Sequence, residues 1–284
     1  MMVIARSICP RRKFRVQVAD DSHTPPRFRY GSFRAVLLAA SLLAGCSTQC
    51  QTAGLYQVST IRALQEGAYD GQVTCGELLR HGDLGIGTFE ALDGEMVVLD
   101  GRVYQAPAQG PVRPALASQK APFAEVTFFR PDRPAARIAA DNFSDLEKRL
   151  DACLPSKNLF YAVRIDATFR HVKTRSVPRQ KEPYPRLVEA AKLQSVFEFH
   201  DIAGTVVGFY CPDYASGVSV PGWHLHFLTA DRTGGGHVLD LAGANLSAKI
   251  QTLRQVHMIL PSGGRFFQAS MTGDASKELE KVEK

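Results

Sequence analysis

The order of apolar and polar residues along the chain predicts a protein dominated by β-strands. Most candidate segments are short runs rich in Val, Ile, Leu, Phe and Tyr, bounded by Gly, Pro, Asp or other turn-forming residues. Several of them alternate apolar and polar positions, which is typical of a strand with one buried face. Strands are expected over residues 95–100, 123–129, 159–165, 172–177, 204–211, 223–228, 237–241 and 249–260.

Apolar residues at helical spacing predict only a few short helices. The clearest start signal is Ser144-Asp145-Leu146-Glu147, a capping box in which the Ser144 hydroxyl accepts a hydrogen bond from the Glu147 amide. Apolar residues at helical spacing continue to Cys153, and Pro155 would end this helix. Further helices are expected over residues 56–66, 187–193 and 275–284.

This succession of elements predicts the fold class. A helix followed by strands occurs twice along the chain, which indicates an α+β fold of two related, β-rich mixed-sheet halves with a few short helices. Residues 55–155 would form the N-terminal half and residues 156–284 the C-terminal half. Residues 1–45 are interpreted as a leader and residues 46–54 as a tether.

The net charge of +6 narrows the range of partners only after it is located along the chain. All of this excess lies in residues 1–45, so the rest of the chain is electrically neutral. A neutral body provides no electrostatic basis for binding the phosphate backbone of a nucleic acid. We therefore expect no nucleic-acid partner.

The leader has the features of an export signal. Arg34 precedes an apolar run over residues 35–44, which is too short to span a bilayer and is typical of a signal peptide. Leu43-Ala44-Gly45-Cys46 resembles a bacterial lipobox, which implies a lipid on Cys46 and a cell-envelope lipoprotein on the periplasmic side. Ser47 in the next position favours sorting to the outer membrane. The alternative is ordinary secretory cleavage, with Cys46 incidental.

Three histidines near the end of the chain carry the strongest chemical signal. His224 and His226 alternate with apolar residues, so both imidazoles leave one face of the predicted strand. A Gly-rich turn can return the chain as a hairpin and bring His237 beside them. Three converging neutral imidazoles supply the protein ligands of an open zinc site. A single histidine in a strand is usually structural. The addition of a third histidine, His237, is therefore what favours a metal site.

The segment around these histidines resembles the zinc-binding segment of the alpha-acetolactate decarboxylases. The similar residues are Gly222-Trp223-His224-Leu225-His226-Phe227, Asp231-Arg232 and Gly235-Gly236-His237-Val238-Leu239-Asp240. Other blocks resemble that family in the same order, at residues 56–60, 81–89, 92–95, 158–162, 164–166 and 173–178. The resemblance covers about residues 55–284.

The resemblance implies a homodimeric enzyme with zinc bound by His224, His226 and His237. Its small-molecule substrate would be 2-acetolactate, a 2-hydroxy-3-oxo acid whose decarboxylation gives acetoin. Loss of CO₂ leaves an enediolate, which a Lewis-acidic metal stabilises, so no organic cofactor is needed. The family's fold is likewise built from duplicated β-rich motifs.

The resemblance also implies catalytic roles for three further residues. Arg175 would pair with the substrate carboxylate or the enediolate, and Glu95 would relay a proton or orient a ligand. The family has a second glutamate near the C-terminus, for which Glu283 is the first choice and Glu280 the alternative. By analogy, Thr60 is a weaker candidate for a substrate contact.

Two other function classes remain open on the residues alone. The histidine pattern also allows a zinc hydrolase in which the metal activates water, and it allows a non-catalytic zinc-binding lipoprotein. The flanking blocks and the presence of Arg175 and Glu95 favour the decarboxylase. The histidines without partner spacing are expected to be structural: His81, His171, His200 and His257.

Overall fold

The structure is a computed structural model that describes residues 54–273 and 275–283. These residues belong to one compact unit. The predicted leader and Cys46 lie outside the described residues. Within the described part of the chain, no helix is long and apolar enough to cross a membrane.

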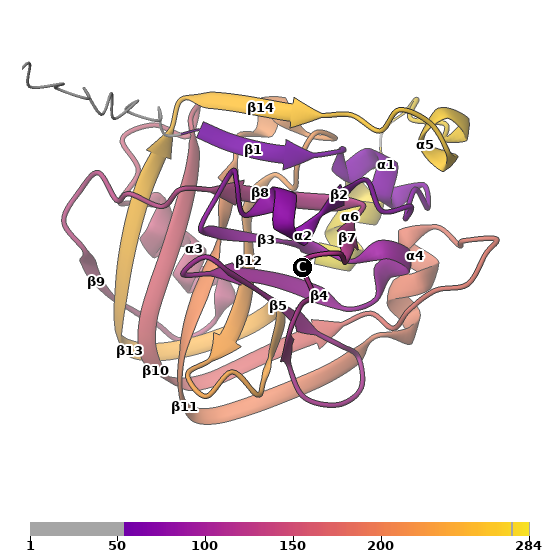
Figure 1. Ribbon diagram of the computed structural model, residues 1–284. Helices are drawn as coiled ribbons and strands as arrows, with labels where there is room; N and C mark the ends of the chain where they lie inside the picture. The colour runs from indigo at the N-terminus through magenta and orange to yellow at the C-terminus, as the bar shows by residue number, and fades with distance from the viewer. Residues whose placement is uncertain (1–53, 274, 284) are drawn as a thin grey trace, which may run out of the picture. The chain divides into compact units, whose positions relative to one another are not determined.

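The first half of the chain supplies most of a seven-stranded sheet (Figure 1). The strand β1 runs parallel to β14, and the other neighbours pair antiparallel, so the sheet is mixed. In spatial order the strands are β14 (Gln255–Ile259), β1 (Gly54–Val58), β8 (Phe123–Thr127), β3 (Leu84–Thr88), β4 (Glu95–Leu99), β5 (Arg102–Ala106) and β6 (Arg113–Pro114).

The second sheet is antiparallel and contains the long curved strands of Figure 1. Its strands are, in spatial order, β10 (Phe160–Ser176), β11 (Ser195–Cys211), β12 (Gly222–Thr229), β13 (Gly235–Leu253) and β9 (Ala136–Ala140). Because β10 pairs with β11 along one edge and with β13 along the other, the sheet closes on itself. A small two-stranded sheet joins β2 (Val73–Thr74) to β7 (Lys120–Ala121).

The helices are short, and the α+β class predicted from the sequence is confirmed. They are α1 (Ile61–Gln65), α2 (Cys75–Leu78), α3 (Phe143–Asp151), α4 (Leu187–Ala190), α5 (Arg265–Gln268) and α6 (Ser276–Glu283). Three 3-10 turns cover Glu90–Leu92, Ala191–Leu193 and Asp213–Ala215. Two strands pair outside the half of the chain to which they belong. The strand β9, from the N-terminal half, joins the five-stranded sheet, and β14, from the C-terminal half, joins the seven-stranded sheet.

Alternating apolar residues pack the two sheets against each other. Val97 of β4 faces Val207 and Leu228 of the closed sheet, whereas Met96 and Val98 point to the opposite side. Burial of such apolar area is the main source of stability for a fold of this size.

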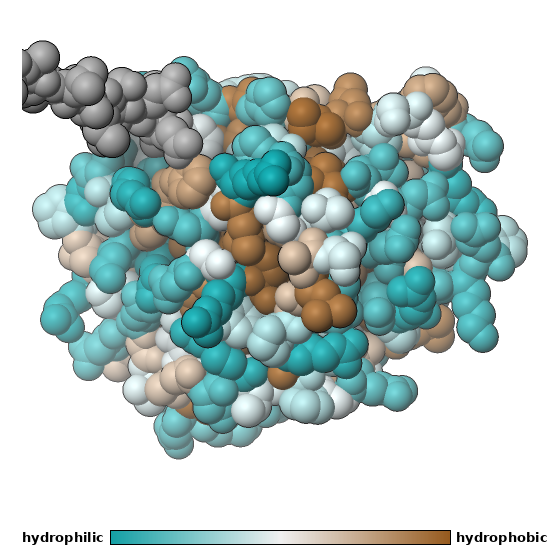
Figure 2. Space-filling model, in the orientation of Figure 1, coloured by the Kyte–Doolittle hydropathy of each residue, from teal (hydrophilic) through white to brown (hydrophobic). Residues whose placement is uncertain are grey.

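On the face shown in Figure 2, apolar residues form a narrow zone near the middle, with hydrophilic residues around it.

The predicted helix over residues 56–66 is wrong in its first half. Tyr56 and Val58 lie in β1, where pairing with β8 and β14 overrides their helical spacing. The helix begins only after Thr60, whose hydroxyl accepts a hydrogen bond from the Ala63 amide at 3.1 Å. Thr60 is therefore the N-cap of α1, a structural role.

In two places, segments that were predicted as separate strands belong to one longer strand. Residues 160–165 and 172–176 belong to the single strand β10, and β13 joins residues 237–241 to residues 249–253. The single strand predicted over residues 249–260 is wrong, because β13 ends at Leu253 and β14 begins at Gln255. Between the predicted pieces the pairing with β11 runs on to Phe169 and resumes at His171, and the intervening Arg170 is exposed and lies at this interruption. A polar segment of the sequence thus did not mark a break in the strand.

The predicted capping box is displaced by two residues. The N-cap of α3 is Asn142, whose side-chain oxygen accepts from the Asp145 amide at 2.9 Å, and Ser144 lies inside the helix. Asn142→Ala is expected to lower the free energy of unfolding by about 1 kcal/mol, the usual loss for such a cap. Ser144→Ala is the control and should change it by less than about 0.5 kcal/mol. Urea unfolding measures both, and equal losses would contradict this assignment of the cap.

Candidate active site and metal centre

The strand β12 carries two histidines on one face and apolar residues on the other. Leu225 and Phe227 pack into the core enclosed by the closed sheet. His224 and His226 point the other way, toward the seven-stranded sheet, because successive side chains of a strand alternate. The amphipathic pattern of this strand therefore turns its imidazoles into the space between the two sheets.

Strand register adds His237 and Arg175 to the same row of side chains. His237 of β13 lies directly opposite His226 of β12, and Arg175 of β10 lies directly opposite His237. Gly236 permits this approach: its φ is 144°, and a Cβ there would lie 2.5 Å from the carbonyl oxygen of Arg175. Three neighbouring strands thus deliver three functional side chains to one place.

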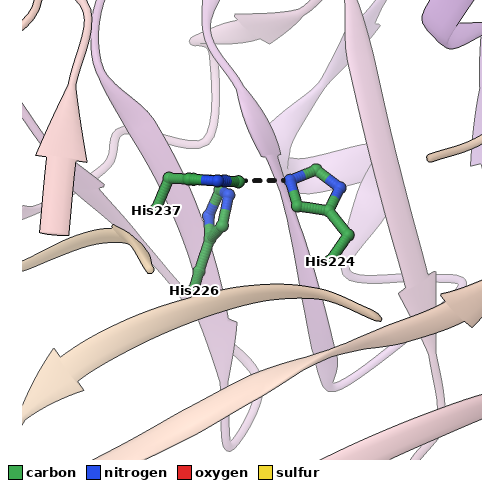
Figure 3. A group of neighbouring side chains, drawn as sticks. All are labelled: His224, His226 and His237. Atoms are coloured by element: carbon green, nitrogen blue, oxygen red, sulfur yellow. Dashed lines mark hydrogen bonds between the residues drawn. The ribbon is translucent and has the colours of Figure 1, made fainter. Parts of the chain in front are cut away.

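The three imidazoles converge, as Figure 3 shows. His224 Nε2 and His237 Nδ1 are 3.2 Å apart, and the three ring centroids are 5.0 to 5.4 Å from one another. Two backbone carbonyls accept from the remaining ring nitrogens: Met96 O lies 2.8 Å from His226 Nδ1, and Glu283 O lies 3.2 Å from His237 Nε2. Since a carbonyl only accepts, these contacts leave His226 Nε2 and His237 Nδ1 free of protons and directed at the centre.

Two carboxylates and the guanidinium complete the cluster. Arg175 Nη1 donates to Glu95 Oε1 at 2.6 Å, and Arg175 Nη2 lies 3.4 Å from Glu283 Oε1. The second oxygen of Glu283 is 3.3 Å from His224 Nε2, and the second oxygen of Glu95 is 3.7 Å from His226 Nε2. The structure therefore brings together all six residues of the predicted site. Glu280, the alternative to Glu283, is exposed to solvent.

Packing of the C-terminal helix accounts for the position of Glu283. Leu279 and Val282 of α6 are buried in an apolar cluster with residues of α1 and α4. Arg186, which precedes α4, is 2.8 Å from Glu278, and this ion pair also fixes the helix. Positions 279, 282 and 283 share one helical face, so burying the two apolar side chains directs the carboxylate inward.

Burial controls the protonation of the cluster. Desolvation, with a smaller contribution from Arg175, lowers the pKa of His224 to about 3, and desolvation likewise holds the pKa values of His226 and His237 well below their usual range. Burial raises the pKa of Glu95 to about 7, although Arg175 acts against this shift. The imidazoles are therefore neutral, the state in which they bind metals.

The donor set fits a metal ion. One nitrogen from each imidazole lies within 4.8 Å of the others. His226 Nε2 and Glu283 Oε2 are buried and have no hydrogen-bond partner, an arrangement that is costly unless a cation lies between them. The separation of 3.2 Å between His224 Nε2 and His237 Nδ1 is close to the roughly 3.3 Å expected for two ligands at bonds of about 2.0 to 2.1 Å in a tetrahedral site.

A small cavity of about 30 Å³ opens onto the cluster. Its polar lining includes Thr88, Glu95, Arg175, His224, His226 and Glu283, and its apolar lining includes Ile61, Leu64, Leu92, Phe123, Val177 and Leu187. A far larger cavity of about 620 Å³ lies beside β1 and β14, but none of the cluster residues lines it. We take the small cavity as the functional one, because polar groups converge on it.

Sequence reasoning missed Thr88. This residue of β3 lies opposite Glu95 of β4, and its hydroxyl donates to the carbonyl oxygen of Gly94 at 2.8 Å. Thr88 lay within one of the blocks that resembled the family. The pattern of residues along β3, however, gave no reason to single it out as a site residue. Only the pairing with β4 shows that it faces the cavity.

Glu125 is a second buried acid that the sequence did not single out. It lies in the middle of β8, fully buried, and its carboxylate accepts a hydrogen bond from the Ser219 hydroxyl. Burial raises the pKa of Glu125 to about 7, against the effect of the Ser219 hydrogen bond. The surrounding residues of β8 are apolar, so the segment is a core strand despite this carboxyl.

The raised pKa of Glu125 predicts a pH dependence of stability. Because its folded pKa exceeds the unfolded value of 4.5, the wild type loses stability as the pH rises from about 4.5 to about 7. Glu125→Gln removes this loss and keeps an acceptor for Ser219. The variant should match the wild type at pH 4.5 and exceed it at pH 8 by on the order of 3 kcal/mol. Urea unfolding at both pH values measures this, and a pH-independent difference would contradict it.

Comparison with known proteins assigns the chain to a family. The alpha-acetolactate decarboxylase family profile matches residues 55–273. The alpha-acetolactate decarboxylase of Methanosarcina mazei is 49% identical over 230 residues, which are 81% of this chain and 80% of that protein. The Bacillus subtilis protein of the same name is 41% identical over 230 residues, which are 81% of this chain and 90% of that protein.

Solved structures show the same fold. The crystal structure of alpha-acetolactate decarboxylase from Bacillus subtilis strain 168 covers 81% of this chain and 99% of its own, with a TM-score of 0.78 and 41% identity. A Staphylococcus aureus protein described as similar to that enzyme covers the same shares, with a TM-score of 0.77 and 33% identity. The fold, the buried polar pocket and these relatives define a carboxy-lyase. The chain belongs to the alpha-acetolactate decarboxylase family.

Proposed function

We propose that the protein decarboxylates 2-acetolactate to acetoin, with a zinc ion bound by His224, His226 and His237. The observation that carries this proposal is the convergence of three neutral imidazoles beside one small cavity, which two of these imidazoles, a guanidinium and two carboxylates line. The relatives at 40 to 49% identity that are named for this reaction support the choice of substrate. Imidazole ligands suit zinc among the common divalent metals.

Zinc at this position would supply Lewis-acid polarisation of the substrate ketone, which makes the neighbouring carboxylate easier to lose. The protein's own side chains then bind the substrate and balance its negative charge. Arg175 donates to two carboxylates, and its contact with Glu283 is the longer one at 3.4 Å. A substrate carboxylate can replace Glu283 as the second partner of Arg175, because a guanidinium grips two oxygens in its plane. Arg175 thus orients the leaving group and balances negative charge.

Glu95 is suited to deliver the proton that replaces CO₂. Loss of CO₂ leaves a carbanion equivalent on the substrate, so one proton must be added for each turnover. Burial raises the pKa of Glu95 to about 7 in the metal-free cluster, which is near the range in which a carboxyl serves as a general acid at neutral pH. Its carboxyl lies within 3.7 Å of His226 and is bonded to Arg175, so it faces the reacting centre.

The apolar lining of the cavity keeps water away from the reaction. Leu92, Phe123 and Val177 form part of this lining, and a water-poor site strengthens every charge interaction inside it. A cavity of about 30 Å³ holds roughly one water-sized group, so substrate binding requires lining side chains or α6 to move. The packing of Leu279 and Val282 sets the resistance of α6 to that movement.

A direct assay distinguishes this function from its alternatives. Purified protein is incubated with racemic 2-acetolactate, and acetoin is measured against the spontaneous rate without protein. The proposal predicts acetoin formation well above that rate. A zinc hydrolase or a non-catalytic metal-binding lipoprotein predicts no increase, and that result would reject the decarboxylase. The proposed homodimer is tested separately by the molar mass from light scattering.

We further propose that the protein is a lipoprotein of the cell envelope, anchored through Cys46. This proposal rests on the lipobox-like Leu43-Ala44-Gly45-Cys46 after the apolar run. Cys46→Ser is expected to block lipidation and leave the uncleaved precursor. Metabolic labelling with a fatty acid, followed by fractionation of membranes, measures this. Wild-type protein without label and wholly outside the membrane fraction would contradict the proposal.

A further inference from the structure

A second group of metal-ligating side chains lies on the long hairpin of β10 and β11, away from the cavity. His171 of β10 and His200 of β11 are direct cross-strand partners, so both imidazoles leave the same face of the sheet (β10 and β11 run side by side in Figure 1). Glu198 precedes His200 by two residues and shares that face. One ligand atom of each residue lies within 4.8 Å of the other two.

The spacing within this group suits an ion better than hydrogen bonds. His171 Nε2 and Glu198 Oε2 are 4.0 Å apart, which is too far for a hydrogen bond. Two ligands of one metal, at bonds of about 2.0 to 2.2 Å, lie roughly 3.3 to 4.2 Å from each other. The rings of His171 and His200 are already stacked, with centroids 5.2 Å apart and an interplanar angle of 30°.

A fixed carboxylate faces the other ring nitrogen of His171. Asp240 Oδ2 lies 4.0 Å from His171 Nδ1, while Asp240 Oδ1 accepts a hydrogen bond from the Phe143 amide at 2.8 Å. A carboxylate on the non-ligating nitrogen is the usual means of orienting a metal-binding imidazole. At 4.0 Å the two atoms are not hydrogen-bonded, so Asp240 lies beside the non-ligating nitrogen and would have to close this gap to orient His171.

One contact competes for Glu198. Lys173 Nζ lies 3.7 Å from Glu198 Oε1, and both side chains are exposed, by 39% and 52% respectively. Exposed ion pairs of this kind contribute at most about 1 kcal/mol. In this ion pair Lys173 contacts Glu198 Oε1, the oxygen that does not face His171. Glu198 Oε2 therefore remains available to bind a metal.

We propose that His171, His200 and Glu198 bind a divalent transition-metal ion of the class that prefers imidazole, such as Zn²⁺ or Cu²⁺, and that this ion fastens β10 to β11. The backbone ladder skips one position next to the site, between the pairs Phe169–Ile202 and His171–His200. Asp201, at the skipped position, has a φ of 47°, in the left-handed region. The ion would bridge the two strands where their backbone pairing is interrupted.

This site is independent of the proposed active centre. His171 precedes Arg175 by four residues, about 13 Å along an extended strand. Its ligands are partly or fully exposed, so its ion exchanges with solvent, whereas the buried centre retains its own. The prediction that His171 and His200 have only structural roles is replaced by this proposal.

The test is a calorimetric titration of the dialysed holoprotein, full chain, with Zn²⁺. We expect one further equivalent to bind beyond the resident metal, and the melting temperature to rise as this equivalent binds. His200→Ala should weaken this binding at least tenfold. Asp240→Asn, which keeps the acceptor for Phe143, should weaken it by about 10- to 100-fold. His257→Ala, an exposed strand histidine outside the group, is the control and should bind like the wild type.

The outcomes separate this proposal from the proposed function. His224→Ala is expected to keep the added equivalent while it loses the resident one, so failure of the buried centre is visible on its own. Binding of no further equivalent by the wild type would overturn the proposal. Equal binding by the wild type and His200→Ala, with both folded by circular dichroism, would overturn it as well.

Discussion

Replacing Arg175 with alanine is expected to lower kcat/KM for acetoin formation by about 100- to 1000-fold, the usual scale for losing one preorganised charge in a buried site. Arg175 donates to Glu95 and lies 3.4 Å from Glu283, and it lines a small cavity with only 4% of its surface exposed. In such a site a fixed positive charge is worth far more than in water. Alanine leaves the charge that develops on the substrate without a partner.

The same variant should shift the pH dependence of the reaction. Arg175 lowers the pKa of Glu95 against the effect of burial, so removing it raises that pKa further above 7. The limb of the pH–rate profile that reports Glu95 should therefore move to higher pH. Protonation of the unpaired carboxyls at neutral pH also limits the loss of stability, because a neutral carboxyl is cheaper to bury than a charged one.

Arg175→Lys is the matched comparison. It keeps the positive charge but lacks the planar pair of donors, so it should recover only part of the lost activity. Metal content should stay near the wild-type value in both variants, because a guanidinium does not ligate the ion. Wild-type kcat/KM in Arg175→Ala at full metal occupancy would show that this residue plays no part in catalysis.

Replacing His224 with alanine is expected to remove the tightly bound metal and, with it, nearly all activity. The substitution removes His224 Nε2, which lies 3.2 Å from His237 Nδ1, and leaves only two imidazoles. Two imidazoles in water rarely hold zinc tightly. Metal content is measured after dialysis against a weak chelator, which strips ions from exposed sites. The expected change is the loss of about one equivalent per chain.

His81→Ala is the control for this experiment. His81 is partly exposed and stacks on Tyr56 with ring centroids 3.8 Å apart, and it lines the large cavity beside β1 and β14 rather than the small cavity at the cluster. It should keep the full equivalent of metal and the wild-type rate. Retention of the metal in His224→Ala would reject the three-histidine centre, whereas its loss from both variants would indicate general destabilisation.

The sequence predicted the parts of the site that depend on local alternation. His224 and His226 share a face because they are two residues apart in a strand, and a hairpin of suitable length brings His237 opposite His226. The resemblance to the family, rather than any local pattern, selected Arg175 and Glu95. Alone, Arg175 would have been taken for an exposed strand residue, but it is 4% exposed because a second sheet covers it.

What the sequence could not show depends on contacts between distant segments. The strand β14 completes the sheet of the N-terminal half although it lies about 200 residues after β1, and no local pattern encodes that pairing. Thr88 faces the cavity only through its pairing with Glu95. The choice between Glu280 and Glu283 required the packing of Leu279 and Val282, which fixes the rotation of α6.

The most direct test of the account is reconstitution of the metal-free protein. The resident metal is removed with a chelator, zinc is added back in steps, and the rate of acetoin formation from 2-acetolactate is followed. The account predicts no activity above the spontaneous rate without metal, and a linear recovery that ends at one zinc per chain. Full activity of the metal-free protein, or zinc-loaded protein that forms no acetoin, would contradict it.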